Sequence, residues 1–318
     1  MAIQTSTLSA AEHDWFATLS GLPANTPLNE HKMKVFSDAG FGGANKPLSQ
    51  QEREWMQSFA NSSKVGQSEL WIELVASIGL TPTKSTTENQ RLFFTSDISL
   101  LQGAIKGLEG LTVYYPLDEL SGTAAVNRAP STFGTLNGTV SNVTIGQAGN
   151  VGKAYSFDGV GDRVIVTGLA PDATFSFFIA FKRNGAPDAN DRILDQASGG
   201  PTRGWHLGLD ADGNVGLRTW NGTGAQLSLD FGIVADGEWC TLGGSIGASA
   251  SAIYLNGVEI DTGLGNSFGA GVIADLQLGA RSGGTNNAVN GSIQHLAVAS
   301  GVEWSPAIHA KLSAFFLT

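Results

Sequence analysis

The feature that most constrains this chain is a series of Asn-Gly and Asp-Gly pairs confined to residues 108–318. Such pairs favour tight hairpin turns, because both residues accept the positive φ angles that a type I′ turn requires. Short apolar runs separate the pairs, and this pattern is typical of an antiparallel sandwich or barrel. The first residues of the pairs are Asn137, Asp158, Asn184, Asp212, Asn221, Asp236, Asn256 and Asn290.

Glycine content divides the chain near residue 107, since most of the 42 glycines follow that point. We therefore predict a helical segment over residues 1–80, a linker over 81–107 and a β domain over 108–318. Within the linker we expect the polar run 81–87 to be extended, and the apolar runs 92–94 and 98–105 indicate that part of it packs on something. The predicted fold class is mainly β: an antiparallel β-sandwich preceded by a small domain of short α-helices. The single cysteine, Cys240, excludes an intrachain disulfide and a cysteine metal cluster.

Three similar segments begin at Leu8, Leu28 and Leu48, and aromatic residues follow at matching offsets. Each segment predicts a helix of about three turns, which is too short to be stable alone. Its apolar stripe must therefore pack against neighbouring helices or against another protein. We predict that the stripes pack against another protein and that four aromatic residues anchor the chain there. The alternative is that these residues form a small core between the helices themselves. These residues are Trp15, Phe36 and Trp55 in the three segments and Trp71 in a fourth predicted helix, which begins at Ser68 and ends at Gly79.

Charge excludes some classes of partner. The formal net charge is −10, and charged residues make up 14% of the chain. An acidic chain does not fit a protein that binds nucleic acid by neutralising phosphates. No apolar run approaches the roughly 18 residues of a membrane span. The first ten residues also lack the basic and apolar regions of a signal peptide, so we expect no export by that route.

Several motifs in the second part occur in a recognisable order. The segment 152–164 reads GKAYSFDGVGDRV, residues 236–239 read DGEW, and residues 253–257 read IYLNG. Together they resemble the laminin-G-like, concanavalin-A-like family. The resemblance implies a jelly-roll fold. It implies no single function, because this fold hosts lectins, adhesins, spacers and hydrolases.

The resemblance also implies a calcium site at one rim of the domain. Carboxylate and carbonyl oxygens are the ligands that Ca²⁺ prefers. Asp158 and Asp162 flank a turn and are the first candidates, with Asp118 as a third. Capping of the turn by these aspartates is the alternative.

A glycan site needs an exposed aromatic platform with polar groups beside it. We predict Trp220 as the platform and Asn221, Arg218 and Arg281 as its polar partners. Catalysis is not expected. Related glucanases carry Glu-x-Asp-x-x-Glu on one strand, whereas here Glu259 and Asp261 are followed by Leu264.

Short helices joined to a laminin-G-like domain resemble bacteriophage structural proteins. The resemblance implies a non-enzymatic virion surface protein, acting in capsid decoration or in a head, neck or tail fibre. The helices would dock on other virion proteins, and the jelly roll would contact host cell-surface glycans, in a homo-oligomer on the particle. The alternatives are a free carbohydrate-binding lectin, a glycan-processing enzyme of the same fold, and an inert spacer.

Overall fold

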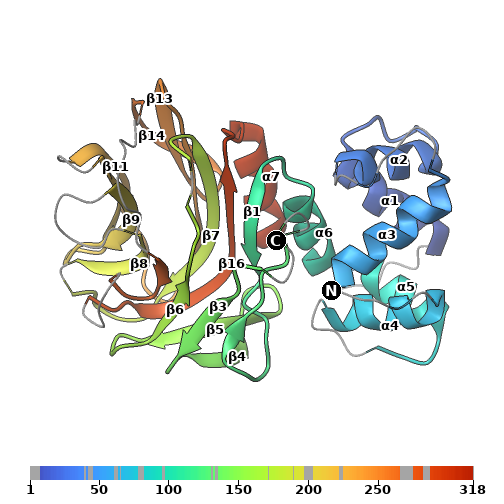
Figure 1. The fold of residues 1–318 in the computed structure, drawn as a ribbon, viewed down its shortest axis with the longest axis horizontal. Coiled ribbons are helices and arrows are strands. Elements are labelled where there is room, and N and C mark those ends of the chain that lie inside the picture. Colours follow the sequence, from blue (N-terminus) through green and yellow to red (C-terminus); the bar gives the residue numbers. More distant parts are fainter. Residues whose placement is uncertain are drawn as a thin grey trace. The chain divides into compact units, whose positions relative to one another are not determined.

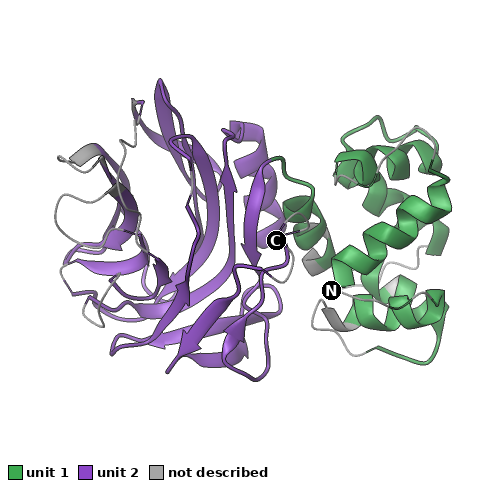
Figure 2. Ribbon diagram, in the orientation of Figure 1, with its two compact units in different colours: residues 1–109 green, residues 110–318 purple. Residues whose placement is uncertain are grey.

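A computed structural model describes most of the chain, and it divides into two compact units, Met1–Glu109 and Gly110–Thr318 (Figure 2). We call them unit 1 and unit 2. Among the helices described, none has the length and apolar character needed to cross a membrane. The described residues are 8–38, 41, 46–60, 64, 66–77, 82–94, 97–129, 132, 135–170, 172–188, 190–196, 203–221, 225–265, 275–281 and 287–317.

Unit 1 is built from short helices around an aromatic core. The ring of Trp15 lies at its centre, with its centroid 5.6 Å from that of Trp55 and 5.5 Å from that of Phe93. Its indole Nε1 donates a hydrogen bond to Ser99 Oγ at 2.9 Å. The helices are α1 (Leu8–Ser20), α2 (Leu28–Asp38), α3 (Leu48–Ala60), α4 (Gln67–Ser77), α5 (Thr86–Phe94) and α6 (Asp97–Lys106).

The four aromatic residues predicted as anchors belong to this core. Trp15, Phe36, Trp55 and Trp71 are each at most 4% exposed. Side chains that are buried against their own unit cannot also cover a partner, so the anchoring prediction is wrong for these residues. The alternative, a small core of their own, describes them.

The stretch 81–107, which we predicted to be a linker, contains α5 and α6. The buried rings of Phe93 and Phe94 join the aromatic core, because one face of α5 turns toward it. Ser85 Oγ accepts a hydrogen bond from the backbone N–H of Glu88 at 3.3 Å. Ser followed three residues later by Glu is a capping signal, and the prediction of an extended run overlooked it.

Unit 2 contains two antiparallel sheets, which we call sheet A and sheet B (Figure 1). Sheet A has the order β14-β13-β12-β7-β16-β5-β4, and β1 also pairs with β16. Its strands are β1 (Leu111–Tyr115), β4 (Thr144–Ala148), β5 (Lys153–Asp158), β7 (Phe175–Arg183), β12 (Trp239–Ile246), β13 (Ala250–Leu255), β14 (Val258–Leu264) and β16 (Asn290–Ser300).

Sheet B has the order β11-β10-β9-β8-β15-β6-β3-β2. Its strands are β2 (Ala124–Ala125), β3 (Gly138–Ser141), β6 (Arg163–Val166), β8 (Asp191–Asp195), β9 (Arg203–Leu209), β10 (Asn214–Asn221), β11 (Ala225–Ile233) and β15 (Leu276–Leu278).

The two sheets enclose one hydrophobic core. The ring of Phe177 in β7 lies 5.3 Å from that of Trp205 in β9, centroid to centroid. The buried Nε1 of Trp205 donates to Gln196 Oε1 at 2.8 Å, so this core tryptophan leaves no polar atom unsatisfied. The predicted antiparallel sandwich is confirmed.

Helix α7 (Pro306–Leu317) covers part of the outer face of sheet A. The ring of His309 stacks on that of Tyr254 with centroids 4.1 Å apart. At the turn from β13 to β14, Asn256 and Gly257 have φ angles of 51° and 80°, as a type I′ turn requires. In the other Asn-Gly and Asp-Gly pairs that are described in full, at most the glycine has a positive φ. The pairs therefore predicted the class of fold better than the type of each turn.

Candidate functional site

Polar side chains collect on the outer face of sheet B, the face turned away from the core. Successive residues of a strand point to opposite faces. Leu194, Trp205 and Leu217 point into the core, so their neighbours point outward. Cα pairing places those neighbours in one row across β8, β9 and β10: Asp195, His206 and Arg218.

Two glycines on this face allow arginine side chains to lie against the sheet. Gly208 and Gly216 are paired across β9 and β10. A Cβ on Gly216 would lie 2.7 Å from Nη1 of Arg218, and a Cβ on Gly208 would lie 2.6 Å from Nη1 of Arg192. Real side chains do not approach so closely, so the two guanidinium groups occupy space that any other residue would fill.

Arg192 and Arg218 each lie beside a carboxylate, and Arg218 Nη1 also donates to the backbone oxygens of Leu217 and Leu229 at 3.2 and 3.4 Å. Arg192 Nε donates to Oδ2 of the buried Asp195 at 3.1 Å. Arg218 Nη2 lies 3.6 Å from Oδ1 of Asp230, an exposed side chain. Arg281 is exposed near the same face, and its charge acts on Arg192. Burial lowers the pKa of Arg192, and the charges of Arg281 and Arg218 act in the same direction, against the effect of Asp195.

His206 lies among these arginines as a neutral ring. Burial lowers its pKa to about 3, and the charges of Arg192, Arg218 and Arg281 contribute to the shift. At neutral pH the imidazole therefore offers one donor and one acceptor and adds no further charge.

Trp220 supplies an aromatic surface beside His206. Its half-buried ring lies with its centroid 4.7 Å from that of His206, at 39° between the planes. Its Cα pairs with Gly204, which has no side chain to cover the indole. We call the group of Arg192, His206, Arg218, Trp220 and Arg281 the arginine face.

The structure brings together three of the four residues that we predicted for glycan binding. Arg218, Trp220 and Arg281 belong to the arginine face. Asn221 is the last residue of β10, but its side chain lies outside the described part of the chain. The sequence prediction did not include Arg192 in the site. Pairing of β8 with β9 brings it there, and the sequence offers no signal for that register.

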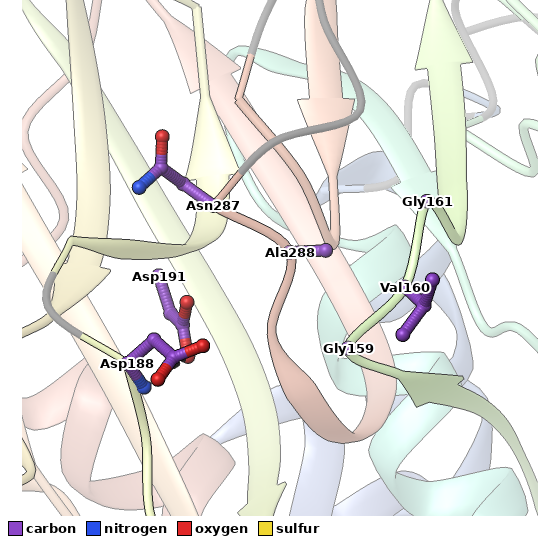
Figure 3. A pocket seen from close by; sticks show the side chains of 7 residues that line it. All are labelled: Gly159, Val160, Gly161, Asp188, Asp191, Asn287 and Ala288. Carbon is purple, nitrogen blue, oxygen red and sulfur yellow. Dashed lines mark hydrogen bonds between the residues drawn. The ribbon is translucent and has the colours of Figure 1, made fainter.

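A shallow pocket of about 480 Å³ lies between the turn that follows β5 and the start of β8 (Figure 3). Asp188 and Asp191 lie close together on one wall, and Val160 lies on the opposite one. Asp188 donates its backbone N–H to Asp191 Oδ2 at 2.9 Å, and burial raises the pKa of Asp191. The pocket adjoins the arginine face through the start of β8, where Arg192 N donates to Asn287 O at 2.9 Å. The remaining lining residues are Gly159, Gly161, Asn287 and Ala288.

The three aspartates predicted as calcium ligands are occupied in other ways. Asp162 Oδ2 accepts the backbone N–H of Asp158 at 2.9 Å, and Asp158 Oδ1 accepts that of Val160 at 2.7 Å. These bonds match the turn-capping alternative. Asp118 is buried in an ion pair with Arg128, and its Oδ2 accepts from Arg128 Nη1 at 3.2 Å. No group of three or more metal-ligating side chains exists among the residues that the structure describes. Asp158 and Asp162 thus cap a turn, and Asp118 lies in an ion pair.

Glu259 and Asp261 lie on opposite faces of β14. A bulge in the β13–β14 pairing sets Asp261 opposite Ile253, which belongs to the core, and Glu259 opposite Tyr254, which packs on α7. A retaining glycosidase needs two carboxyl groups about 5–5.5 Å apart beside the substrate. This pair does not provide that arrangement.

Comparisons with known proteins agree with this architecture. Residues 158–302 match a family model described as the concanavalin A-like lectin/glucanases superfamily, Laminin_G_3. The chain is similar to Domain 4 of AbnA, a GH43 extracellular arabinanase from Geobacillus stearothermophilus, solved in complex with arabinotriose. That match has 20% identity and a TM-score of 0.51, and covers 64% of this chain and 98% of the domain.

Two further solved structures are similar to the chain over part of their length. A structure concerned with cell entry of botulinum neurotoxin type C and two ganglioside molecules matches with 15% identity and a TM-score of 0.50, over 65% of this chain and 52% of that one. Trypanosoma rangeli sialidase matches with 14% identity and a TM-score of 0.48, over 65% of this chain and 33% of that one. The chain thus spans about half and a third of these proteins. None of the curated proteins matches it.

Proposed function

We propose that this chain is a non-enzymatic carbohydrate-binding protein that uses the arginine face of sheet B. The observation that carries the proposal is the half-buried ring of Trp220 beside His206 and Arg218. A sugar ring stacks its C–H groups on an indole, while its hydroxyls need donors and acceptors at the rim of the stack. Arginine donates, and neutral histidine does both, so the face offers the complete set.

The similar structures support the proposal through their fold and the ligands their names give. Domain 4 of AbnA was solved with arabinotriose, and the neurotoxin structure concerns two gangliosides. Identities of 20% or less carry the fold and not the site, so the ligand of this chain is proposed from its own residues. The activities of the larger proteins are not transferred to it.

A glycan-processing enzyme is the second candidate function. The observation in its favour is that Asp188 and Asp191 line the pocket and that burial raises the pKa of Asp191, the direction that a general acid needs. Asp191 is however held by the N–H of Asp188, which is a common turn arrangement. Release of reducing sugar from a polysaccharide, absent in Asp191→Asn, would favour the enzyme; no turnover by the full chain would favour binding alone.

The finer proposal is a virion location. We propose that the chain is a bacteriophage surface protein, in a capsid, neck or tail position, with unit 1 attached to other virion proteins and the chain arranged as a homo-oligomer. The division into a helical unit and a β unit supports it. Because the aromatic residues of unit 1 are buried, attachment would use other surfaces of that unit. Mass spectrometry of purified particles tests the location, and a chain found only outside particles would contradict it.

The experiment that tests carbohydrate binding uses the full chain on a glycan array. We expect saturable binding that Trp220→Ala weakens by about tenfold or more, since stacked aromatics dominate such sites. Trp239→Ala is the matched control, because Trp239 is a half-buried tryptophan on sheet A, beside Phe316. Equal loss in both variants would contradict the site. Calcium binding by Asp158 and Asp162 stays a prediction, and an arm with EDTA measures it.

A further inference from the structure

Helix α7 packs on sheet A separately from the sandwich core. Among the residues that the structure describes, the core enclosed by the two sheets includes none from α7. The helix instead contacts the outward side of β12, whose residues alternate with core residues such as Leu242. Thr241 Oγ1 on that side lies 2.7 Å from Ser313 Oγ of α7 in a buried hydrogen bond. The helix can therefore leave sheet A while the core stays closed.

His309 of α7 is buried in this contact. Its Nε2 lies 2.9 Å from Oγ of Ser245, a further outward residue of β12. Ser245 Oγ donates its own proton to the backbone oxygen of Trp304 at 2.6 Å, so it accepts from Nε2. The neutral imidazole therefore carries its proton on Nε2, and Nδ1 is the nitrogen without one.

The contact has no place for a second proton on His309. Nδ1 is buried, and the described part of the chain offers it no hydrogen-bond partner. It faces the backbone of Gly243, where a Cβ would come closer to Nδ1 than real side chains do and would lie 3.0 Å from Cε1. The ring of Tyr254 covers one face of the imidazole. A proton on Nδ1 would thus bury a charged donor with nothing to accept from it, which is strongly unfavourable.

Titratable groups around this contact do not compensate a charge on His309. Burial lowers the pKa of His309 to about 3, with no opposing charge in the described part of the chain. Tyr254 on β13 keeps its proton, because burial raises its pKa and the charge of Glu259 adds to the shift. The other titratable groups around α7 are the exposed Glu259 on β14 and Glu303 before the helix, Lys311 on α7 itself, Lys182 on β7 over the Trp239 ring, and the buried His295 on β16, whose ring centroid lies 6.0 Å from that of Phe316.

We propose that α7 is a pH-sensitive clasp, which stays docked on sheet A while His309 is neutral and is released when a proton binds to His309 Nδ1. Release exposes the outward side of β12. A helix of 12 residues is too short to be stable alone, so the released segment also loses its helical hydrogen bonds. The inference goes beyond the proposed function, because the arginine face lies on the other sheet.

Hydrogen exchange of the full chain, followed by mass spectrometry at pH 7 and pH 5, tests the release. Protection factors are compared between peptides from α7 and peptides from β7, a core strand that reports opening of the whole unit. A pKa of about 6.5 in the released segment and about 3 in the docked helix raises the open fraction of α7 by about 25-fold over this range. We expect α7 to lose protection by that factor and to be less protected than β7 at both pH values.

Variants assign the response to His309. His309→Gln keeps a donor for Ser245 Oγ, and His309→Phe keeps a ring on Tyr254; neither side chain binds a proton, so α7 should lose its pH dependence in both. Gly243→Ala should lower the protection of α7 already at pH 7, because the new Cβ displaces the imidazole. His13→Gln, which removes a half-buried histidine of unit 1, is the control and should keep the full 25-fold response.

Three results would overturn the clasp. Equal protection of α7 and β7 would mean that the helix opens only together with the whole unit. Equal protection of α7 at pH 7 and pH 5 would mean that no proton drives its release. A pH dependence that persists in the His309 variants would exclude His309 as the responsible group. The first two comparisons need only the unchanged chain, so they stand even where a variant does not fold.

Discussion

Replacing Gly216 with alanine separates binding from stability at the arginine face. The backbone of Gly216 does not need a positive φ, so alanine fits it. The new Cβ would lie 2.7 Å from Nη1 of Arg218 and 3.1 Å from its Cζ. These atoms are the flexible end of a side chain, so the guanidinium moves off the sheet at little cost to the fold. Alanine for glycine at a compatible position stabilises a protein by about 0.4–1 kcal/mol.

We therefore expect Gly216→Ala to keep or slightly raise the free energy of unfolding while it weakens glycan binding. A hydrogen bond to a charged group contributes about 1.5–3 kcal/mol, which corresponds to about ten- to a hundredfold in Kd. Urea titration followed by tryptophan fluorescence measures stability, and isothermal titration calorimetry measures binding. Gly66→Ala is the control, since a Cβ there makes ordinary contact at 3.5 Å with Glu69. Unchanged affinity in a stable Gly216→Ala protein would refute the argument that Arg218 must lie flat on the sheet.

Three predictions concern stability. Burial lowers the pKa of His206, His295 and His309 from 6.5 to about 3, so folding favours their neutral form and stability falls as the pH drops below 6.5. The free energy of unfolding from urea titrations at pH 7 and pH 5 should therefore differ by about 2 kcal/mol for each histidine. Equal midpoints at the two pH values would contradict this. Asp118→Asn leaves Arg128 buried without its partner and should cost about 3–5 kcal/mol by chemical denaturation; a loss below about 1 kcal/mol would show a solvated pair. Trp15→Ala removes the centre of the unit 1 core and should lower the free energy of unfolding by about 3–5 kcal/mol. Circular dichroism should show the helices melting at a lower temperature, and an unchanged melting temperature would contradict the burial of Trp15.

The class of fold follows from local patterns in the sequence. Turn pairs and short apolar runs between them act over a few residues, so they are visible without knowledge of distant contacts. The motif around 152–164 falls on β5 and β6, with a turn between them that Asp158 and Asp162 cap. Of the pairs described in full, only Asn256-Gly257 forms the predicted turn with two positive φ angles. The number of turn signals and their spacing predicted the sandwich, whereas the geometry of the individual turns was mostly not the one predicted.

In unit 1, the sequence showed that the aromatic residues must be covered but not by what. An amphipathic helix has the same pattern whether its stripe packs on a neighbour or on another protein. The missing partner was α5, whose Phe93 and Phe94 close the core around Trp15 and Trp71. The apolar runs in the stretch 81–107 indicated that part of it packs on something, but only the tertiary structure shows that Phe93 and Phe94 cover Trp15 and Trp71.

At the candidate site, the sequence by itself determined which residue types were available. It also placed Arg218 and Trp220 two residues apart on one strand, and therefore on the same face. It could not bring in Arg192 or Asp195, which reach the site through the register of β8 on β9. Register is set by how the inward side chains of both sheets fill a common core, a long-range condition. The same condition places the bulge that turns Glu259 and Asp261 to opposite faces. The sequence alone therefore determines which residues are present and which of them share a face of one strand. The cluster of charges and the pKa shifts within it form only when the strands pair.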